Sequence, residues 1–192
     1  MKDYFMKGLA TILFLTFTVI SYGQDTASNE LKPTPTGFVK YSLNKRLSFF
    51  PFTSAKQIKL VSFHLQDDAI KGQQRRSYSI PLLNGKVDLS KLTDVVELNS
   101  SQIDSLTDIL YNDCSKWTLI EQSKVMCYMP RNAIVFYNQK NEPFEYIEIC
   151  FECLGFKTSS NEIISPDKCD IMFKELQLLF ERYGLSTKMS NK

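Results

Sequence analysis

The sequence has little of several residue types, and each shortage excludes a class of protein. Only 7 of its 192 residues are glycine and 7 are proline, which excludes a collagen-like chain. The formal net charge is +2, too small and too evenly spread to indicate a nucleic-acid-binding surface. Apolar and aromatic residues make up 43% of the chain and charged residues 23%. This composition excludes a disordered chain and a multi-span membrane protein, and indicates a globular one.

The chain has a single histidine, His64, which limits the chemistry open to it. A histidine-rich metal site is excluded, and a Ser-His-Asp or Cys-His arrangement could use only this residue as its base. Ser62 lies on the same predicted strand, but two residues apart on one strand is a poor angle for proton transfer. We therefore predict that His64 is a half-buried, hydrogen-bonded structural residue. The sequence also has no phosphate-binding loop and no carboxylate pair at a recognisable catalytic spacing.

The first 23 residues have the pattern of a secretory signal. Two lysines precede an uncharged run from Gly8 to Ile20, which is 13 residues long. A membrane-spanning helix needs about 20 apolar residues, whereas the core of a signal peptide needs roughly 7 to 15. Small residues then stand at positions −3 and −1 of a cleavage site before Gln24. We predict that residues 1–23 are a signal peptide and that the mature protein is periplasmic or secreted; an uncleaved N-terminal anchor is the alternative.

The exported part divides into a linker and one domain. Residues 24–37 are polar and contain two prolines, so they cannot bury enough apolar surface to offset the entropy lost on ordering. We predict a flexible linker there and a single domain over residues 38–192, because no second linker and no internal repeat follows. All five cysteines lie in this domain, and disulfides persist in exported proteins.

Several runs in the domain have the alternation and composition of β-strands. Residues 56–65 alternate and are rich in β-formers, and Asn84-Gly85 is the strongest short signal for a hairpin turn. Residues 131–138 and 143–153 are two strand-like runs separated by a few polar residues. They predict an antiparallel hairpin with Lys140-Asn141 as its two-residue turn.

Two segments have helical spacing. Residues 99–113 supply a serine cap with an acidic residue three positions on, followed by apolar residues at helical intervals. Near the C-terminus, Ser165 and Pro166 form a cap followed by proline at the first helical position, and an apolar face then runs to Gly184. Together the elements predict an α+β fold, in which an antiparallel sheet with a central β-hairpin carries two amphipathic helices on one face.

Cys150 and Cys153 have the C-x-x-C spacing of redox sites, but their predicted position is unsuitable. Thioredoxin-type reactivity needs the first sulfur at a helix N-terminus, where the helix dipole lowers the thiol pKa, whereas Cys150 ends a strand. Three steps along a regular strand separate two Cα atoms by about 10 Å, beyond the ~7 Å limit for a disulfide. Unless the strand breaks at Phe151 or Glu152, these two cysteines cannot bond to each other.

The hairpin suggests a different pairing, between Cys127 and Cys153. Pro130 cannot donate a ladder hydrogen bond, and a bulge there would insert one extra residue into its strand. Cys127 would then lie directly across from Cys153, at the ~4.5 to 5.5 Å that a disulfide can span. In this scheme Cys169 is a free, buried thiol on the last helix, and Cys114 and Cys150 have no assigned partner.

A candidate binding cluster surrounds the cysteine end of the hairpin. The predicted register sets Arg131 opposite Cys150, with Glu148 and Glu152 as diagonal neighbours on the same face. Such a cluster could bind the charged group of a ligand or lower a thiol pKa, and its alternative is an ordinary surface ion pair.

A soft-metal site is the alternative use of the hairpin cysteines. Cys127, Cys150 and Cys153 converge on one end of the predicted hairpin, and thiolates suit Cu(I) or zinc. A strong zinc signal would be two C-x-x-C knuckles, and the chain has one such pair. The metal site therefore remains an alternative to the binding cluster.

Residues 127–153 resemble the hairpin segment of a family of exported bacterial proteins that has the pattern C-Y-x-P-R-x-x-I-x-F-Y … I-E-I-C-F-E-C. No activity is assigned to that family. Asn132 stands where the pattern often has histidine, so a role that needs an imidazole there does not carry over. The resemblance implies export and a shared hairpin, and it implies no reaction.

Together these observations favour a binding protein over an enzyme. We expect an exported domain that binds an envelope protein or a small ligand through its sheet face or the cysteine end of the hairpin. We expect no catalytic residue, no cofactor, no nucleic-acid partner and no membrane span after signal cleavage. The competing function is that of a thiol-redox or soft-metal protein that uses the hairpin cysteines.

Overall fold

The computed structural model of the chain describes residues 39–65, 67–70, 73–76, 78–116 and 128–188. Its internal contacts divide the chain into Met1–Leu31 and Lys32–Lys192, and every described residue belongs to the second unit. The predicted signal peptide, the predicted linker and Cys127 lie outside the described residues. Within the described ranges, no helix is long and apolar enough to cross a membrane.

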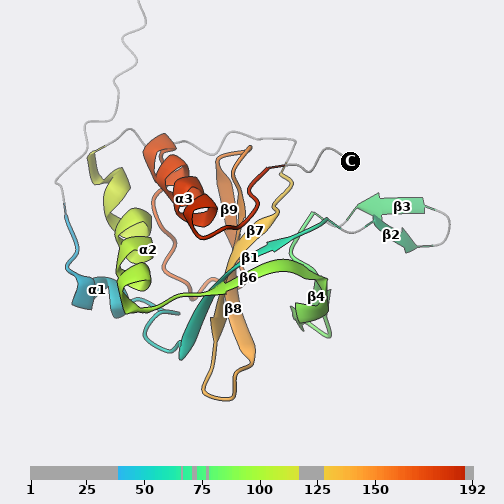
Figure 1. The fold of residues 1–192 in the computed structure, drawn as a ribbon, viewed down its shortest axis with the longest axis horizontal. Coiled ribbons are helices and arrows are strands. Elements are labelled where there is room, and N and C mark those ends of the chain that lie inside the picture. The colour runs from blue at the N-terminus through green and yellow to red at the C-terminus, as the bar shows by residue number, and fades with distance from the viewer. Residues whose placement is uncertain (1–38, 66, 71–72, 77, 117–127, 189–192) are drawn as a thin grey trace, which may run out of the picture. The chain divides into compact units, whose positions relative to one another are not determined.

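A five-stranded antiparallel sheet forms the centre of this unit (Figure 1). Its strands lie in the order β6 (Leu92–Glu97), β1 (Gln57–Phe63), β7 (Asn132–Tyr137), β8 (Pro143–Cys150) and β9 (Gly155–Thr158). All six residues of the middle strand β7 are buried. Such a strand needs cover on both faces of the sheet.

Two helices, α2 (Ser100–Asn112) and α3 (Asp170–Arg182), cover one face (Figure 1). Leu106 of α2 and Leu176 of α3 share a core cluster with Ile134 of β7 and Ile149 of β8. The predicted α+β architecture, an antiparallel sheet with two amphipathic helices on one face, is therefore confirmed.

The two helices begin differently from the prediction. Asn99, not a serine, caps α2, and it forms a capping box with Gln102. Helix α3 begins at Asp170, after the predicted cap at Ser165. The preceding segment is instead bound elsewhere, because the Ile164 N–H donates to the Phe50 carbonyl over 3.3 Å and the Ile164 carbonyl accepts from the Tyr111 hydroxyl. Tertiary hydrogen bonds thus replace the local helix signal.

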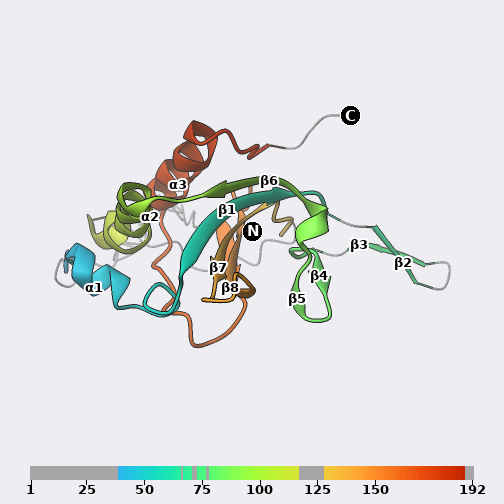
Figure 2. The ribbon, with the colours of Figure 1, turned by 60° about the horizontal axis from the view of Figure 1, so that its bottom comes forward.

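The opposite face of the sheet is covered by residues 78–92 (Figure 2). This segment contains the short hairpin of β4 (Leu82–Leu83) and β5 (Lys86–Val87). It turns at Asn84 and Gly85, whose φ angles are 51° and 79°, as the Asn-Gly signal predicts. Ile80 and Val87 of this segment pack against the apolar side chains of β1 and β7 to form a second core.

The remaining elements are short. Helix α1 (Leu43–Leu47) lies against α2 through the buried guanidinium of Arg46, which pairs with Asp104 and, at 3.1 Å, with Asp108. A single 3-10 turn, η1 (Leu89–Lys91), leads into β6, and another, η2 (Asp113–Lys116), follows α2. Strands β2 (Asp67–Ile70) and β3 (Gln73–Arg76) pair with each other.

The central β7–β8 hairpin has the predicted strands and a longer turn. The Asn138 N–H donates to the Glu142 carbonyl over 2.9 Å, which leaves a three-residue loop that ends at Asn141, with φ 59°. The predicted two-residue turn is therefore one residue too short. A bulge between Phe136 and Tyr137 compensates for the extra residue, so the rest of the hairpin keeps the predicted register.

Candidate functional site

The four described cysteines form two disulfides. Cys114 in η2 bonds to Cys169, the residue before α3, with their Cα atoms 5.5 Å apart. Cys150 bonds to Cys153, with a Cα separation of 5.3 Å. The prediction of a free thiol at Cys169 is therefore wrong, because the ends of α2 and α3 meet in a way that the sequence pattern does not indicate.

The Cys150–Cys153 bond contradicts the expectation that these two cysteines have different partners or none, because the strand breaks at Phe151, the condition under which the sequence allowed this bond. Strand β8 ends at Cys150, and residues 151–154 form a turn in which the Leu154 N–H donates to the Phe151 carbonyl over 3.3 Å. This break brings the two Cα atoms to a distance that a disulfide spans, which a continuous strand would not do.

The predicted Cys127–Cys153 pairing depended on a bulge at Pro130. Strand β7 begins at Asn132, after that proline, and the observed bulge lies at the other end of the strand. In the structure the partner of Cys153 is Cys150, and Cys127 lies outside the described residues.

The disulfide also bears on the soft-metal alternative. Two of its three candidate ligands, Cys150 and Cys153, are bonded to each other and do not offer thiolates in this state. Among the described residues, no group of three or more His, Cys, Asp or Glu side chains is arranged to hold a metal ion.

Glu148, a predicted binding residue, lies in the interior and is only 2% exposed. Its Oε2 accepts hydrogen bonds from the Ser79 hydroxyl at 2.8 Å and from the Ile80 N–H at 2.9 Å. These bonds join β8 to the segment that covers the second face of the sheet. The carboxylate is therefore occupied by the protein itself, and its role is structural.

Tyr128 is half-buried and lies beside Glu148. Its hydroxyl donates to the Glu148 carbonyl at 3.3 Å, and its ring lies under the Lys157 ammonium at 4.1 Å from the ring centre. Burial and the neighbouring Glu148 carboxylate both raise the pKa of the Tyr128 hydroxyl. The phenol therefore stays protonated at physiological pH.

The other members of the predicted cluster are not joined to Glu148. Among the described residues, no ion pair connects Arg131 with Glu148 or Glu152, and the Arg131 Nε is buried without a hydrogen-bond partner. Glu152 is exposed in the turn, and its Oε2 lies 3.9 Å from the Cys150 sulfur. The structure thus brings Glu152 close to Cys150 and leaves Glu148 in a separate, internal site.

The structure also locates His64 and Asn132, two residues that the sequence singled out. His64 follows the last residue of β1 and is exposed, so the expectation that it is half-buried is wrong. Asn132 is buried, and its amide donates to the Ser62 hydroxyl at 3.1 Å and to the Ser186 carbonyl at 2.9 Å. Asn132 therefore holds the C-terminal segment to the sheet.

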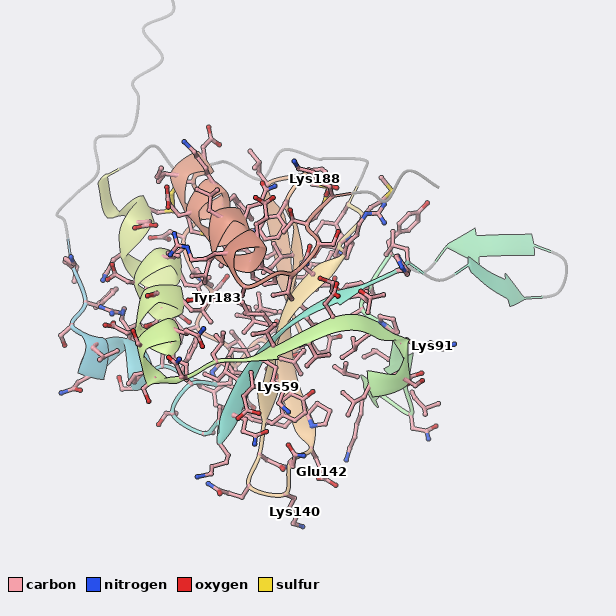
Figure 3. All side chains as sticks on the ribbon, viewed as in Figure 1. Lys59, Lys91, Lys140, Glu142, Tyr183 and Lys188 are labelled. Carbon is pink, nitrogen blue, oxygen red and sulfur yellow. A yellow bond between two sulfur atoms is a disulfide. The ribbon has the colours of Figure 1, made fainter. Side chains whose placement is uncertain are left out.

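A groove of about 520 Å³ lies at the other end of β8. It is bounded by the β4–β5 hairpin, by the tip of the β7–β8 hairpin and by the residues that follow β9. Figure 3 shows Lys140 and Glu142 at that tip. The apolar part of the lining comes from Leu82, Val87, Pro143 and Phe144.

The polar part of the groove is centred on Glu145. Its carboxylate accepts hydrogen bonds from the hydroxyls of Ser159 and Ser160, the second at 2.9 Å. Ser159 is itself fixed to β8, since its hydroxyl oxygen accepts from the Tyr146 N–H at 2.8 Å and its N–H donates to the Tyr146 carbonyl at 3.0 Å. The carboxylate is therefore held in one position before any ligand arrives.

At the edge of the groove the Lys86 ammonium lies 3.8 Å from the Glu142 carboxylate, and both side chains are exposed. Within the described ranges, no lysine or arginine pairs with Glu145. Sequence reasoning missed this groove because its lining comes from three separate segments. The Asn84-Gly85 turn, which places the β4–β5 hairpin, is the one local signal of its presence.

Comparison of the chain with protein-family models, with curated proteins and with solved structures gave no match.

Proposed function

We propose that this protein is an exported, non-enzymatic binding domain and that its ligand occupies the groove between the β4–β5 hairpin and the ends of β8 and β9. The observation that carries the proposal is the fixed Glu145 carboxylate beside apolar side chains in a groove of about 520 Å³. Ligand sites have typical volumes of roughly 300 to 1,000 Å³ and combine an apolar lining with a few well-placed polar groups.

This proposal moves the binding site away from the cysteine end of the hairpin. At that end the Glu148 carboxylate is buried and occupied by Ser79 and Ile80. At the groove, Glu145 is half-buried and borders open space. A half-buried carboxylate can contact a ligand without the protein giving up internal hydrogen bonds.

The groups in the groove favour binding over catalysis. Its described lining has no histidine and no cysteine. The hydroxyls of Ser159 and Ser160 donate to the Glu145 carboxylate, so both protons are used in internal hydrogen bonds. These groups can position a ligand by hydrogen bonds and charge.

Export is supported by two independent features. Residues 1–23 have the composition of a cleaved signal. The four described cysteines are all in disulfides, which persist in oxidising compartments and are rare in the cytosol.

The binding site can be tested by nuclear magnetic resonance with a library of cationic, anionic and neutral fragments. We expect the amide shifts caused by fragments to cluster at groove residues, such as Gly85, Tyr146 and Ser159. The variant Ser160→Tyr should fill the groove and reduce these shifts, whereas Ser101→Tyr, at an exposed position of α2, should leave them unchanged. Shifts that cluster elsewhere, or none, would refute the proposed site.

The Cys150–Cys153 disulfide favours a second candidate function, thiol–disulfide exchange. Cys153 is half-exposed, whereas Cys150 is 1% exposed. The thiolate of a small thiol would attack the Cys153 sulfur and form a mixed disulfide, and Cys150 would leave as a thiolate. A second molecule of the small thiol would then attack the mixed disulfide. Cys153 would leave as a thiolate, and the two small thiols would leave joined in their own disulfide.

This second candidate predicts that Cys150→Ser, made in a Cys127→Ser background, reacts with oxidised glutathione: the Cys153 thiolate forms a mixed disulfide and one reduced glutathione leaves. The matched variant Cys114→Ser, made in the same Cys127→Ser background, frees Cys169, which is 0% exposed, and should form none. Intact mass spectrometry with and without reductant would measure both. Equal modification of the two variants would mean that Cys153 has no special reactivity.

A further inference from the structure

We infer that the groove binds a basic side chain, lysine or arginine, of an extended partner polypeptide, together with an apolar side chain next to it. This inference rests on the proposed function and names the chemical class of the ligand. Three features of the groove support it: its charge, the polarity of its hydrogen-bonding groups and its exposed apolar side chains.

The charged side chain that is held in position in the groove, Glu145, is negative. Glu145 is held by two neutral hydroxyls, which orient the carboxylate and do not neutralise it. Glu142 adds a second carboxylate at the edge. Its partner Lys86 is exposed at 3.8 Å, and an ion pair of that kind contributes little and is easily exchanged for another cation.

The hydrogen-bond polarity of the groove also favours a cationic donor. Ser160 uses its proton on Glu145 and therefore presents lone pairs to the groove. Asn138 does not add a free acceptor, because its Oδ1 accepts from the N–H groups of Lys140 and Glu142 and its amide N–H donates to the Glu142 carboxylate at 3.4 Å. Ammonium and guanidinium groups, which only donate, match the acceptors that remain, the Glu145 carboxylate and the Ser160 hydroxyl oxygen.

The apolar surface beside the groove points to a polypeptide rather than to a small cation. Leu82 lines the groove and is 46% exposed, and Leu83 and Leu89 on the adjoining segment are 61% and 49% exposed. Exposed apolar side chains with a polar rim mark interaction surfaces. An extended peptide with an apolar residue beside its basic one would cover Leu82 at the groove, which a free polyamine would not.

The test is a binding titration of the mature protein with short capped peptides by calorimetry and amide shifts. The probe is Gly-Leu-Lys-Leu-Gly, and the comparison probes are Gly-Leu-Glu-Leu-Gly, Gly-Gly-Lys-Gly-Gly and free spermidine. We expect the first peptide to bind at the groove at least about tenfold more tightly than each of the others.

Variants that remove single charges show which side chains contact the lysine of the peptide. Glu145→Gln should weaken binding of the lysine peptide at least about fivefold, and Glu142→Gln about twofold. Lys86→Ala should strengthen binding, because it removes a competing cation. The control Glu152→Gln, an exposed carboxylate at the other end of β8, should have no effect. Unchanged melting temperatures would show that Glu145→Gln and Glu142→Gln remain folded.

The outcomes separate this inference from the proposed function. If fragments bind in the groove but the glutamate peptide binds as well as the lysine peptide, the basic-ligand inference is overturned and the binding function stands. If spermidine bound as tightly as the lysine peptide, the inference that the ligand is a polypeptide would be overturned. Absence of any binding in the groove would overturn both.

Discussion

Single buried polar residues determine how the covering segment of this protein attaches to its sheet. Glu148 is 2% exposed and accepts two hydrogen bonds from the 78–92 segment. A buried carboxylate with such partners stabilises the fold, and its removal leaves donors without an acceptor.

We therefore expect Glu148→Ala to lower the free energy of unfolding by about 2 to 3 kcal/mol, because the Ser79 hydroxyl and the Ile80 N–H lose their acceptor. Glu152→Ala, an exposed carboxylate on the following turn, should change it by less than about 0.5 kcal/mol. Urea titration of the two variants would measure both values. Equal losses would contradict the structural role of Glu148.

Asp113 gives a pH-dependent prediction at the same scale. Burial and the carboxylates of Asp108 and Glu175 raise its pKa to about 6, and Lys40 partly offsets them. The folded state then binds a proton more tightly than the unfolded state. The free energy of unfolding therefore falls as the pH rises from about 4, the unfolded pKa of Asp113, to about 6, its folded pKa.

The variant Asp113→Asn should therefore raise the free energy of unfolding at pH 8 by about 1 kcal/mol, a value reduced for partial exposure. At pH 4 it should have almost no effect, because the wild-type carboxyl is then largely protonated in the folded state. Urea titration at the two pH values would measure the difference. A gain of equal size at pH 4 would mean that the effect is not electrostatic.

At the scale of elements, the sequence predicted the strands and helices whose apolar residues recur at a regular spacing. The strand at Gln57–Phe63, the β7–β8 hairpin and both long helices show a repeat of two or of about 3.6 residues, and each is present. The start of α3 at Asp170 was not predictable, because a hydrogen bond from Ile164 to Phe50 replaces the local cap. Strand β9 was missed since its four residues are too few to show a period.

The helices give a direct test of their packing. Leu106 is 0% exposed and Leu179 is 2% exposed in the core beneath the helices. Each changed to Ala should lower the free energy of unfolding by about 2 to 5 kcal/mol. The control Leu178→Ala, at a position that is 42% exposed, should cost less than about 1 kcal/mol. Similar losses at 178 and 179 would mean that α3 is rotated.

At the scale of the whole molecule, the groove and the disulfides depend on contacts between segments far apart in the sequence, which the sequence pattern does not indicate. The groove is lined by residues from the 82–87, 138–146 and 159–160 segments, and no spacing within one segment indicates that these meet. The disulfides were missed for the same reason, since Cys114 and Cys169 are 55 positions apart and only the packing of α2 on α3 brings them together.

The two disulfides should differ in their effect on global stability. In the chain-entropy model a cross-link over 55 positions stabilises the fold by about 4 kcal/mol, and one over 3 positions by about 2 kcal/mol. We therefore expect Cys114→Ser to lower the melting temperature more than Cys150→Ser. Calorimetry would measure both, after non-reducing peptide mapping of the wild type has verified the two pairs. A Cys127–Cys153 peptide in that map would contradict the observed pairing.

The central claim is that the groove beside Glu145 holds a basic and apolar segment of a partner polypeptide. Intermolecular nuclear Overhauser effects between the mature protein and the peptide Gly-Leu-Lys-Leu-Gly test it most directly. The structure predicts contacts from the leucine methyl groups of the peptide to Leu82 and Val87, and from its lysine side chain to Glu145. Contacts to residues of α2, α3 or the 150–153 turn in place of these would contradict the claim.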